Sequence, residues 1–87
     1  MTSPNDRTQE ITDWLVKTVA KTLEIPAFEI DTNASFERYG MDSSAAAHIV
    51  GELEKWLGRK LPSNLAYQYS SISALAQFIA SSEQAAS

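Results

Sequence analysis

Helical character is clearest in DSSAAAHIVGELEKWLG, residues 42–58. Its apolar side chains recur at the period of an α-helix with one buried face; they are Ala46, Ile49, Val50, Leu53 and Leu57. Asp42 can cap the start, because its carboxylate accepts first-turn amides and meets the positive end of the helix dipole. Gly58 can end the helix in a left-handed conformation. We therefore predict a helix over residues 43–57 with Ile49, Leu53 and Leu57 in the core.

A second amphipathic period lies upstream, at Ile11, Leu15, Val19 and Leu23. It predicts a first helix, for which Ser3 and Pro4 offer an early start as N-cap and first helical residue. Pro26 stops this helix, since proline cannot continue one. Residues 25–40 then indicate a long irregular loop, because isolated apolar residues alternate there with Asp, Asn and Ser. We expect its apolar side chains to enter the core; they are Ile25, Phe28, Ile30, Phe36 and Tyr39.

Two further helical segments complete the pattern. Residues 64–69 carry apolar side chains at a spacing that one turn can use, namely Leu65, Ala66 and Tyr69. Ser71 is placed to cap a last helix, whose inward residues are Ile72, Leu75, Ala76, Phe78 and Ile79. Residues 81–87 are small and polar, so we expect a flexible tail.

These segments predict an all-α fold. No stretch alternates between apolar and polar residues, and no Asn-Gly or Asp-Gly turn is present. The expected architecture is a small four-helix bundle with three longer helices, one short helix and a long first loop. At 87 residues the chain is expected to be one domain, 1–87, with a folded core over about 8–80, flexible polar termini and a monomeric state.

Composition excludes several classes of protein. The chain is 44% hydrophobic, which is too apolar for a disordered chain, yet no apolar run approaches the roughly 20 residues of a membrane span. It has no Cys, so it forms no disulfide and no thiolate metal site. Nothing at the N-terminus resembles a secretory signal. We expect a cytoplasmic protein that does not bind membranes.

The charge distribution argues against nucleic-acid binding. The net charge is -4, and residues 1–42 account for all of it with eight acids against four bases. Residues 43–87 balance at three acids and three bases. The chain therefore offers no basic stripe to a phosphate backbone.

The sequence contains no pattern typical of a catalytic site or of a metal site. His48 follows Ser44 by one helical turn, but a hydrolytic pair also needs an orienting group and an oxyanion hole. The acids of residues 1–42 do not follow the spacing of a calcium loop. We expect a solvated histidine and solubilising charge, with no catalytic residue and no metal.

A more specific pattern lies where the long loop meets the predicted helix: Tyr39-Gly40-Met41-Asp42-Ser43-Ser44. It resembles the phosphopantetheine attachment site of acyl carrier proteins, in which a Gly, an apolar residue, Asp and Ser open the second helix. The resemblance continues through most of the chain. It includes Glu29-Ile30-Asp31, Ser35-Phe36, Leu53-Glu54-Lys55-Trp56-Leu57-Gly58, residues 62–69, and Ser71-Ile72 with Ala74-Leu75-Ala76.

The resemblance implies that Ser43 bears a covalent 4'-phosphopantetheine arm, derived from coenzyme A, on which acyl or polyketide intermediates are held as thioesters. A protein without Cys must import its thiol, and a helix N-terminus suits the phosphate left on the serine. Carriers usually have Leu, Ile or Val after the modified serine, whereas this chain has Ser44. Two adjacent hydroxyls are therefore available, and the Gly40-Met41-Asp42 register is what favours Ser43.

The implied partners are a phosphopantetheinyl transferase, an acyl-loading enzyme (an acyltransferase or an acyl-AMP ligase), and a ketosynthase or other acyl-modifying enzymes. They would contact the helix start and the small, nearly neutral outward stripe of the second helix, which comprise Met41, Asp42, Ser44, Ala45, Ala47, His48, Gly51, Glu54 and Lys55. A polyketide-type acyl carrier without catalytic activity is the expected function. A peptidyl or aryl carrier of a nonribosomal peptide pathway, and a helical domain that binds partners noncovalently, are the alternatives.

Overall fold

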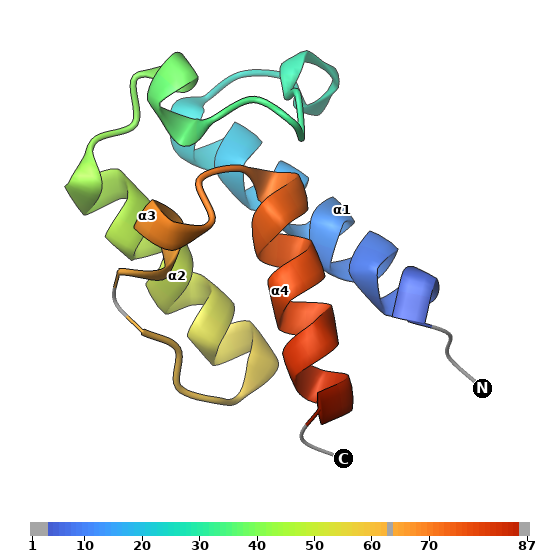
Figure 1. Cartoon of the computed structure of the whole chain (residues 1–87). Coiled ribbons are helices and arrows are strands. Elements are labelled where there is room, and N and C mark those ends of the chain that lie inside the picture. The colour runs from blue at the N-terminus through green and yellow to red at the C-terminus, as the bar shows by residue number, and fades with distance from the viewer. Residues whose placement is uncertain (1–3, 63, 86–87) are drawn as a thin grey trace.

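The computed structural model describes residues 4–62 and 64–85, which form a helical bundle (Figure 1). The elements in chain order are α1 (Pro4–Leu23), the 3-10 turns η1 (Ala27–Glu29) and η2 (Phe36–Tyr39), α2 (Ser43–Leu57), α3 (Leu65–Gln68) and α4 (Ile72–Ala85). No sheet forms within these ranges. The predicted all-α bundle of three longer helices and one short helix is confirmed.

The helices α1 and α4 pack side by side and supply the centre of the core (Figure 1). Their fully buried side chains match the predicted periods and include Ile11, Leu15, Val19, Ile72, Leu75 and Ile79. Burial of these apolar side chains contributes roughly 1.5–3 kcal/mol each to the hydrophobic stabilisation of the folded state. The other elements therefore pack around the pair formed by α1 and α4.

Both of these helices extend beyond the predicted core of residues 8–80. α1 begins at Pro4, and α4 continues to Ala85, so the expected flexible tail is helical from Ser81 to Ala85. Arg7 and Glu83 explain the difference, because their side chains form an ion pair that joins the two helix ends, with Nε and Oε1 2.7 Å apart. The suggested N-cap, Ser3, lies outside the described residues.

Helix α2 has the predicted bounds and caps. Asp42 has an extended backbone, and its Oδ1 accepts a hydrogen bond from the amide of Ala45 at 2.8 Å. Gly58 has a φ of 73°, a left-handed conformation that glycine adopts without a Cβ clash. Leu57 is half-buried rather than buried, because it lies in the last turn next to this cap. The buried residues of α2 are Ile49, Val50 and Leu53.

The segment between α1 and α2 differs from the prediction. It forms the two turns η1 and η2 rather than a wholly irregular loop. Phe28 was expected in the core but is 87% exposed, because it lies on the outer side of the tight η1 turn. Ile25 is half-buried. Of the five apolar side chains expected to enter the core, Ile30, Phe36 and Tyr39 do pack into or against it.

Backbone hydrogen bonds fasten this segment to the connection between α3 and α4. The amide of Phe36 donates to the carbonyl of Ser70 at 2.8 Å, and the amide of Ser73 donates to the carbonyl of Thr32 at 2.9 Å. A buried backbone group without a partner would be costly, so these bonds fix where η2 can lie. η2 and α3 are thereby held beside the N-terminal end of α2 (Figure 1).

The short α3 and the start of α4 follow the prediction. Leu65 and Ala66 are buried, so one face of this single turn is fixed by the core. The Oγ of Ser71 accepts a hydrogen bond from the amide of Ala74 at 3.1 Å, which is the expected cap of α4.

Candidate functional site

Ser43 is the first residue of α2, and its side chain is exposed. The chain reaches it through Gly40, whose φ of 74° ends the η2 turn in a left-handed conformation. Asp42 follows in an extended conformation and caps the helix. The hydroxyl of Ser43 is thus presented at the positive end of the α2 dipole, where a negatively charged group is stabilised.

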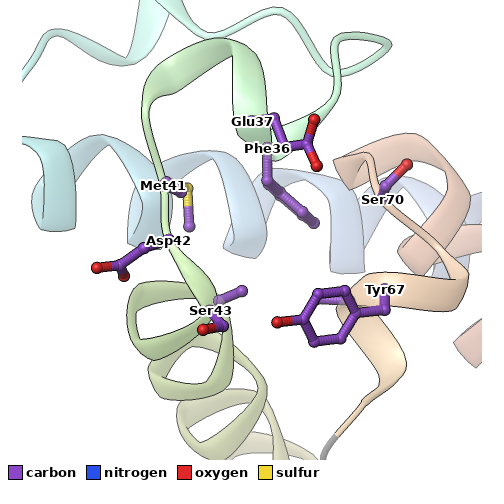
Figure 2. A pocket seen from close by; sticks show the side chains of 9 residues that line it. Phe36, Glu37, Met41, Asp42, Ser43, Tyr67 and Ser70 are labelled. Atoms are coloured by element: carbon purple, nitrogen blue, oxygen red, sulfur yellow. The ribbon is translucent and has the colours of Figure 1, made fainter.

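The carboxylate of Asp42 is engaged in capping rather than in activating Ser43. Its Oδ1 accepts the amide of Ala45, and Figure 2 shows the carboxylate turned away from the neighbouring hollow. A general base must reach the proton that it removes. The structure gives Ser43 exposure at a helix start, which suits a residue that another enzyme modifies.

A pocket of about 260 Å³ opens beside Ser43, between η2, α2 and α3. Apolar side chains and polar groups share its wall, and the lining residues are Phe36, Glu37, Met41, Asp42, Ser43, Ala46, Ala66, Tyr67 and Ser70. Figure 2 shows Tyr67 across the pocket from Ser43, with its hydroxyl pointing toward the serine. Tyr67 is 71% exposed, so its ring forms the outer wall.

The pocket distinguishes the two adjacent serines. Ser43 and Ser44 are both exposed, but Ser43 lines the pocket and Ser44 does not. A group attached to Ser43 therefore has a concave surface next to it, whereas Ser44 lies on the open face of α2. The difference favours the register that the sequence suggests.

Met41 was expected to contact partner proteins, and its burial argues against that role. Its side chain is 7% exposed and belongs to the core cluster. The apolar residue before Asp42 instead anchors the junction between η2 and α2, and it reaches the site only as part of the pocket wall.

The outward stripe of α2 is close to the expected one. Its exposed members are Ser44, Ala47, His48 and Lys55, and its half-buried members are Ala45, Gly51 and Glu54. Glu54 differs from the expectation of a free surface charge. Its Oε2 accepts the amide of Leu61 at 2.7 Å, so this carboxylate anchors the connection from α2 to α3.

His48 lies on the exposed surface of α2, as expected. Its Nε2 is 3.9 Å from Oε1 of Glu52, one helical turn away. Across residues 4–62 and 64–85, no group of three or more His, Cys, Asp or Glu side chains is arranged to hold a metal ion. In that same part of the chain, every helix is too short or too polar to cross a membrane.

Sequence reasoning did not assign six residues of the pocket wall to the site: Phe36, Glu37, Ala46, Ala66, Tyr67 and Ser70. Ala46 lies on α2 itself, Phe36 and Glu37 lie on η2 shortly before Ser43, and Ala66, Tyr67 and Ser70 lie in or just after α3, more than twenty positions after Ser43. Their meeting depends on the hydrogen bond from Phe36 to Ser70, which no local pattern predicts. The one available signal was Tyr67, because Leu65 and Ala66 occupy the inward face of this turn and leave the tyrosine outward.

Comparison with known protein families identifies the family to which this chain belongs. The family described as "Phosphopantetheine attachment site" matches residues 13–79, which is most of the chain. The chain belongs to this family of phosphopantetheine-bearing carrier proteins. Such carriers have no catalytic activity of their own. The predicted family and its cofactor are therefore confirmed.

The similar proteins include an acyl carrier protein, a polyketide synthase and a peptidyl carrier protein. Acyl carrier protein TtuC of Teredinibacter turnerae is 35% identical over 77 residues, covering 88% of each chain. Polyketide synthase PksL of Bacillus subtilis is 29% identical over 80 residues; these cover 92% of this carrier but only 2% of the synthase. A free-standing peptidyl carrier protein from Acinetobacter baumannii has a similar structure, with a TM-score of 0.83 and 29% identity over 87% of this carrier and 95% of that chain.

Proposed function

We propose that this carrier holds acyl or polyketide intermediates as thioesters on a 4'-phosphopantetheine arm attached to Ser43. The observation that carries the proposal is the placement of Ser43: an exposed hydroxyl at the N-terminus of α2, directly after the Asp42 cap and beside a pocket. The similarity to an acyl carrier protein and to a polyketide synthase supports the acyl cargo. The bound arm supplies the thiol that this chain lacks.

The residues present fit a phosphodiester on Ser43. The α2 dipole favours its negative charge, and the carboxylate of the preceding residue, Asp42, accepts a hydrogen bond from the amide of Ala45. Attachment forms a bond from Ser43 Oγ to the phosphorus that carries pantetheine and breaks the pyrophosphate bond of coenzyme A. Adenosine 3',5'-bisphosphate leaves, and the serine proton passes to a base of the transferase.

The proposed partners are a Mg-dependent phosphopantetheinyl transferase, an acyltransferase or acyl-AMP ligase that loads the arm, and a ketosynthase or other acyl-modifying enzyme. We place this activity in the cytoplasm, where coenzyme A is available to the transferase. The exposed stripe of α2 begins directly after Ser43, so an enzyme that reaches the arm also meets the stripe.

The test is modification by a broad-specificity transferase with coenzyme A, followed by intact-protein mass spectrometry. The wild-type chain and Ser44→Ala should each gain the mass of one arm, and Ser43→Ala should gain none. Modification of Ser43→Ala but not of Ser44→Ala would move the site by one residue. A wild-type chain that stays unmodified would favour a helical domain that binds partners noncovalently.

A peptidyl cargo is the second candidate, because the similar carrier from Acinetobacter baumannii is a peptidyl carrier protein. Against it, Asp42 stands where peptidyl carriers often have His. Loading of the modified chain distinguishes the two. Acceptance of acyl groups from an acyl-AMP ligase or acyltransferase, without acceptance of aminoacyl groups from an amino-acid-activating enzyme, would support the acyl assignment.

A further inference from the structure

A second hollow of the molecule is a groove between α1 and α2. Its volume is about 570 Å³, and its lining residues are Trp14, Lys17, Thr18, Lys21, Thr22, His48 and Glu52. None of them lines the pocket beside Ser43, so the groove and the attachment site use different residues. We propose that this groove binds an extended acidic segment of a partner protein, with Lys17 and Lys21 holding two of its carboxylates.

Each wall of the groove is one stripe of a helix. The α1 residues begin at Trp14 and recur at positions i, i+3, i+4, i+7 and i+8, which lie on the same helical face. The α2 wall consists of His48 and Glu52, which are one turn apart, with Nε2 and Oε1 separated by 3.9 Å. Because both walls are regular helices, the groove is a fixed feature of the fold rather than a loop conformation.

The charge of the groove is positive and unpaired. Lys17 and Lys21 are both exposed. Within residues 4–62 and 64–85, the ion pairs involve Arg7 and His48 but neither of these lysines. Glu52 supplies the carboxylate of the lining, and it lies next to His48. Two free ammonium groups thus meet in one groove of a chain whose net charge is -4, and an acidic ligand is complementary to them.

The spacing of the two lysines favours an extended ligand. Four residues of an α-helix rise about 6 Å, and alternate residues of an extended chain point the same way about 6.6 Å apart. Two acids separated by one residue can therefore meet Lys17 and Lys21 together. Two turns of a bound helix would occupy about 900 Å³ with their side chains, which exceeds the volume of the groove.

Trp14 gives the groove an apolar contact next to the lysines. Its half-buried ring stacks on Trp56, with the centroids 5.0 Å apart and the planes 11° from parallel. The ring is thereby held in place, and it can contact an apolar side chain of the segment, as aromatic residues do in protein interfaces. The Thr18 hydroxyl already donates to the carbonyl of Trp14 at 2.9 Å, whereas the exposed Thr22 hydroxyl can bond to the backbone of the segment.

The test is a nuclear magnetic resonance titration of the ¹⁵N-labelled full chain with the peptide acetyl-Leu-Ser-Glu-Ser-Glu-amide. We expect saturable shifts of the amide resonances of residues 14–22 and 48–52. The same peptide with Gln in place of both Glu should cause no such shifts, because its carboxylates are gone. Raising the salt concentration from about 0.05 M to about 0.5 M should weaken binding about threefold or more, since screening then acts within a few Å.

Two double variants locate the binding site. Lys17→Gln combined with Lys21→Gln should weaken binding of the acidic peptide about fivefold or more, since two ion pairs are lost. The matched control combines Lys55→Gln with Lys60→Gln, which removes two exposed lysines outside the groove and should leave binding nearly unchanged. All four positions are exposed, so circular dichroism should show the wild-type helix content in both variants.

Several outcomes would overturn the proposal. Absent shifts, or equal binding of the Gln peptide, would mean that the groove does not recognise an acidic segment. Equal losses in the two double variants would mean that the peptide senses only the net charge. The same shifts with inorganic phosphate would assign the groove to small anions, and the same shifts on concentrating the protein alone would assign it to a second copy of the chain. None of these outcomes bears on attachment of the arm, because Ser43 is not part of the groove.

Discussion

Arg7 and Glu83, 76 positions apart in the chain, form a two-point ion pair in which Arg7 Nε donates to Oε1 at 2.7 Å and Nη2 donates to Oε2 at 2.9 Å. The pair joins the first turns of α1 to the last turns of α4. Its guanidinium also lies 5.3 Å from the centre of the Trp56 ring, and Trp56 stacks on Trp14 with the ring centroids 5.0 Å apart. One side chain therefore links three helices.

This ion pair should make stability depend on acidity. The hydrogen bonds from Arg7 lower the pKa of Glu83 below its ordinary value near 4.5, although desolvation partly opposes them. A lowered folded-state pKa stabilises the fold above the unfolded value and loses that contribution as the pH falls through the folded value. Glu83→Gln should lower the free energy of unfolding by about 0.5–1 kcal/mol at neutral pH and reduce the acid sensitivity below about pH 4.5.

Urea unfolding at a series of pH values measures this effect. The stacked Trp14 and Trp56 separate on unfolding, so tryptophan fluorescence reports the transition. The matched control is Glu10→Gln, which removes the more exposed partner of Arg7, one turn away on α1. An unchanged acid dependence in Glu83→Gln would show that the pair contributes nothing to stability.

Leu53 is the α2 residue whose truncation should cost most. It is fully buried in the core cluster, and Leu53→Ala should lower the free energy of unfolding by about 2–5 kcal/mol, since it loses apolar burial and leaves a cavity. Leu57→Ala, at a half-buried position of the last turn, should cost clearly less. Denaturant midpoints of the two variants check the order. Equal midpoints, or a larger loss at Leu57, would mean that the faces of α2 are assigned wrongly.

Helix α2 shows what the sequence can predict. The helix begins where Asp42 caps the amide of Ala45. It ends where Gly58 closes the last turn in a left-handed conformation. Its inward face follows from the helical period. Such local effects are visible in the sequence, and the predicted bounds of 43–57 match the structure.

The errors lie where a turn or a returning segment, rather than a helical period, decides the outcome. Phe28 is outside because the η1 turn is tight, and Glu54 is paired because the chain returns past it at Leu61. The pocket forms because the backbone amide of Phe36 donates a hydrogen bond to the carbonyl of Ser70. Hydrophobicity and charge at a single position do not specify these contacts. The position of Ser43 at the start of α2 could be predicted from local residues, whereas the pocket wall facing it could not.

Two substitutions of Asp42 can distinguish how much its capping hydrogen bond and how much its charge contribute to stability. Asp42→Ala removes the acceptor for the amide of Ala45 and should lower the free energy of unfolding by about 1 kcal/mol. Asp42→Asn keeps a capping oxygen, so its stability should stay within a few tenths of a kcal/mol of wild type. Thermal or urea unfolding of both variants gives the comparison. A loss as large in Asp42→Asn as in Asp42→Ala would assign the effect to charge and dipole instead of the hydrogen bond.

The final prediction concerns how partner enzymes recognise α2. The stripe around Ala47 and Gly51 is small and nearly uncharged, and the carboxylate of Glu54 is held by the amide of Leu61. Steering by charge needs a large summed field, and exposed charges are screened over about 8 Å at physiological salt. We therefore expect acyl loading by the cognate enzyme to change little across a salt series, because close approach rather than attraction governs docking.

Substitutions that fill the stripe test this expectation. Ala47→Glu and Gly51→Arg should each lower kcat/KM for loading by about tenfold or more, which corresponds to about 1.4 kcal/mol of lost binding. Gly51→Ala is the matched control: its Cβ would meet nothing within 4 Å, so it should raise stability by about 0.5–1 kcal/mol and leave loading nearly unchanged. A steep loss of loading with salt, together with indifference to Ala47→Glu and Gly51→Arg, would instead place recognition on the acidic residues 1–42, since only that half of the chain carries the net charge a partner could sense.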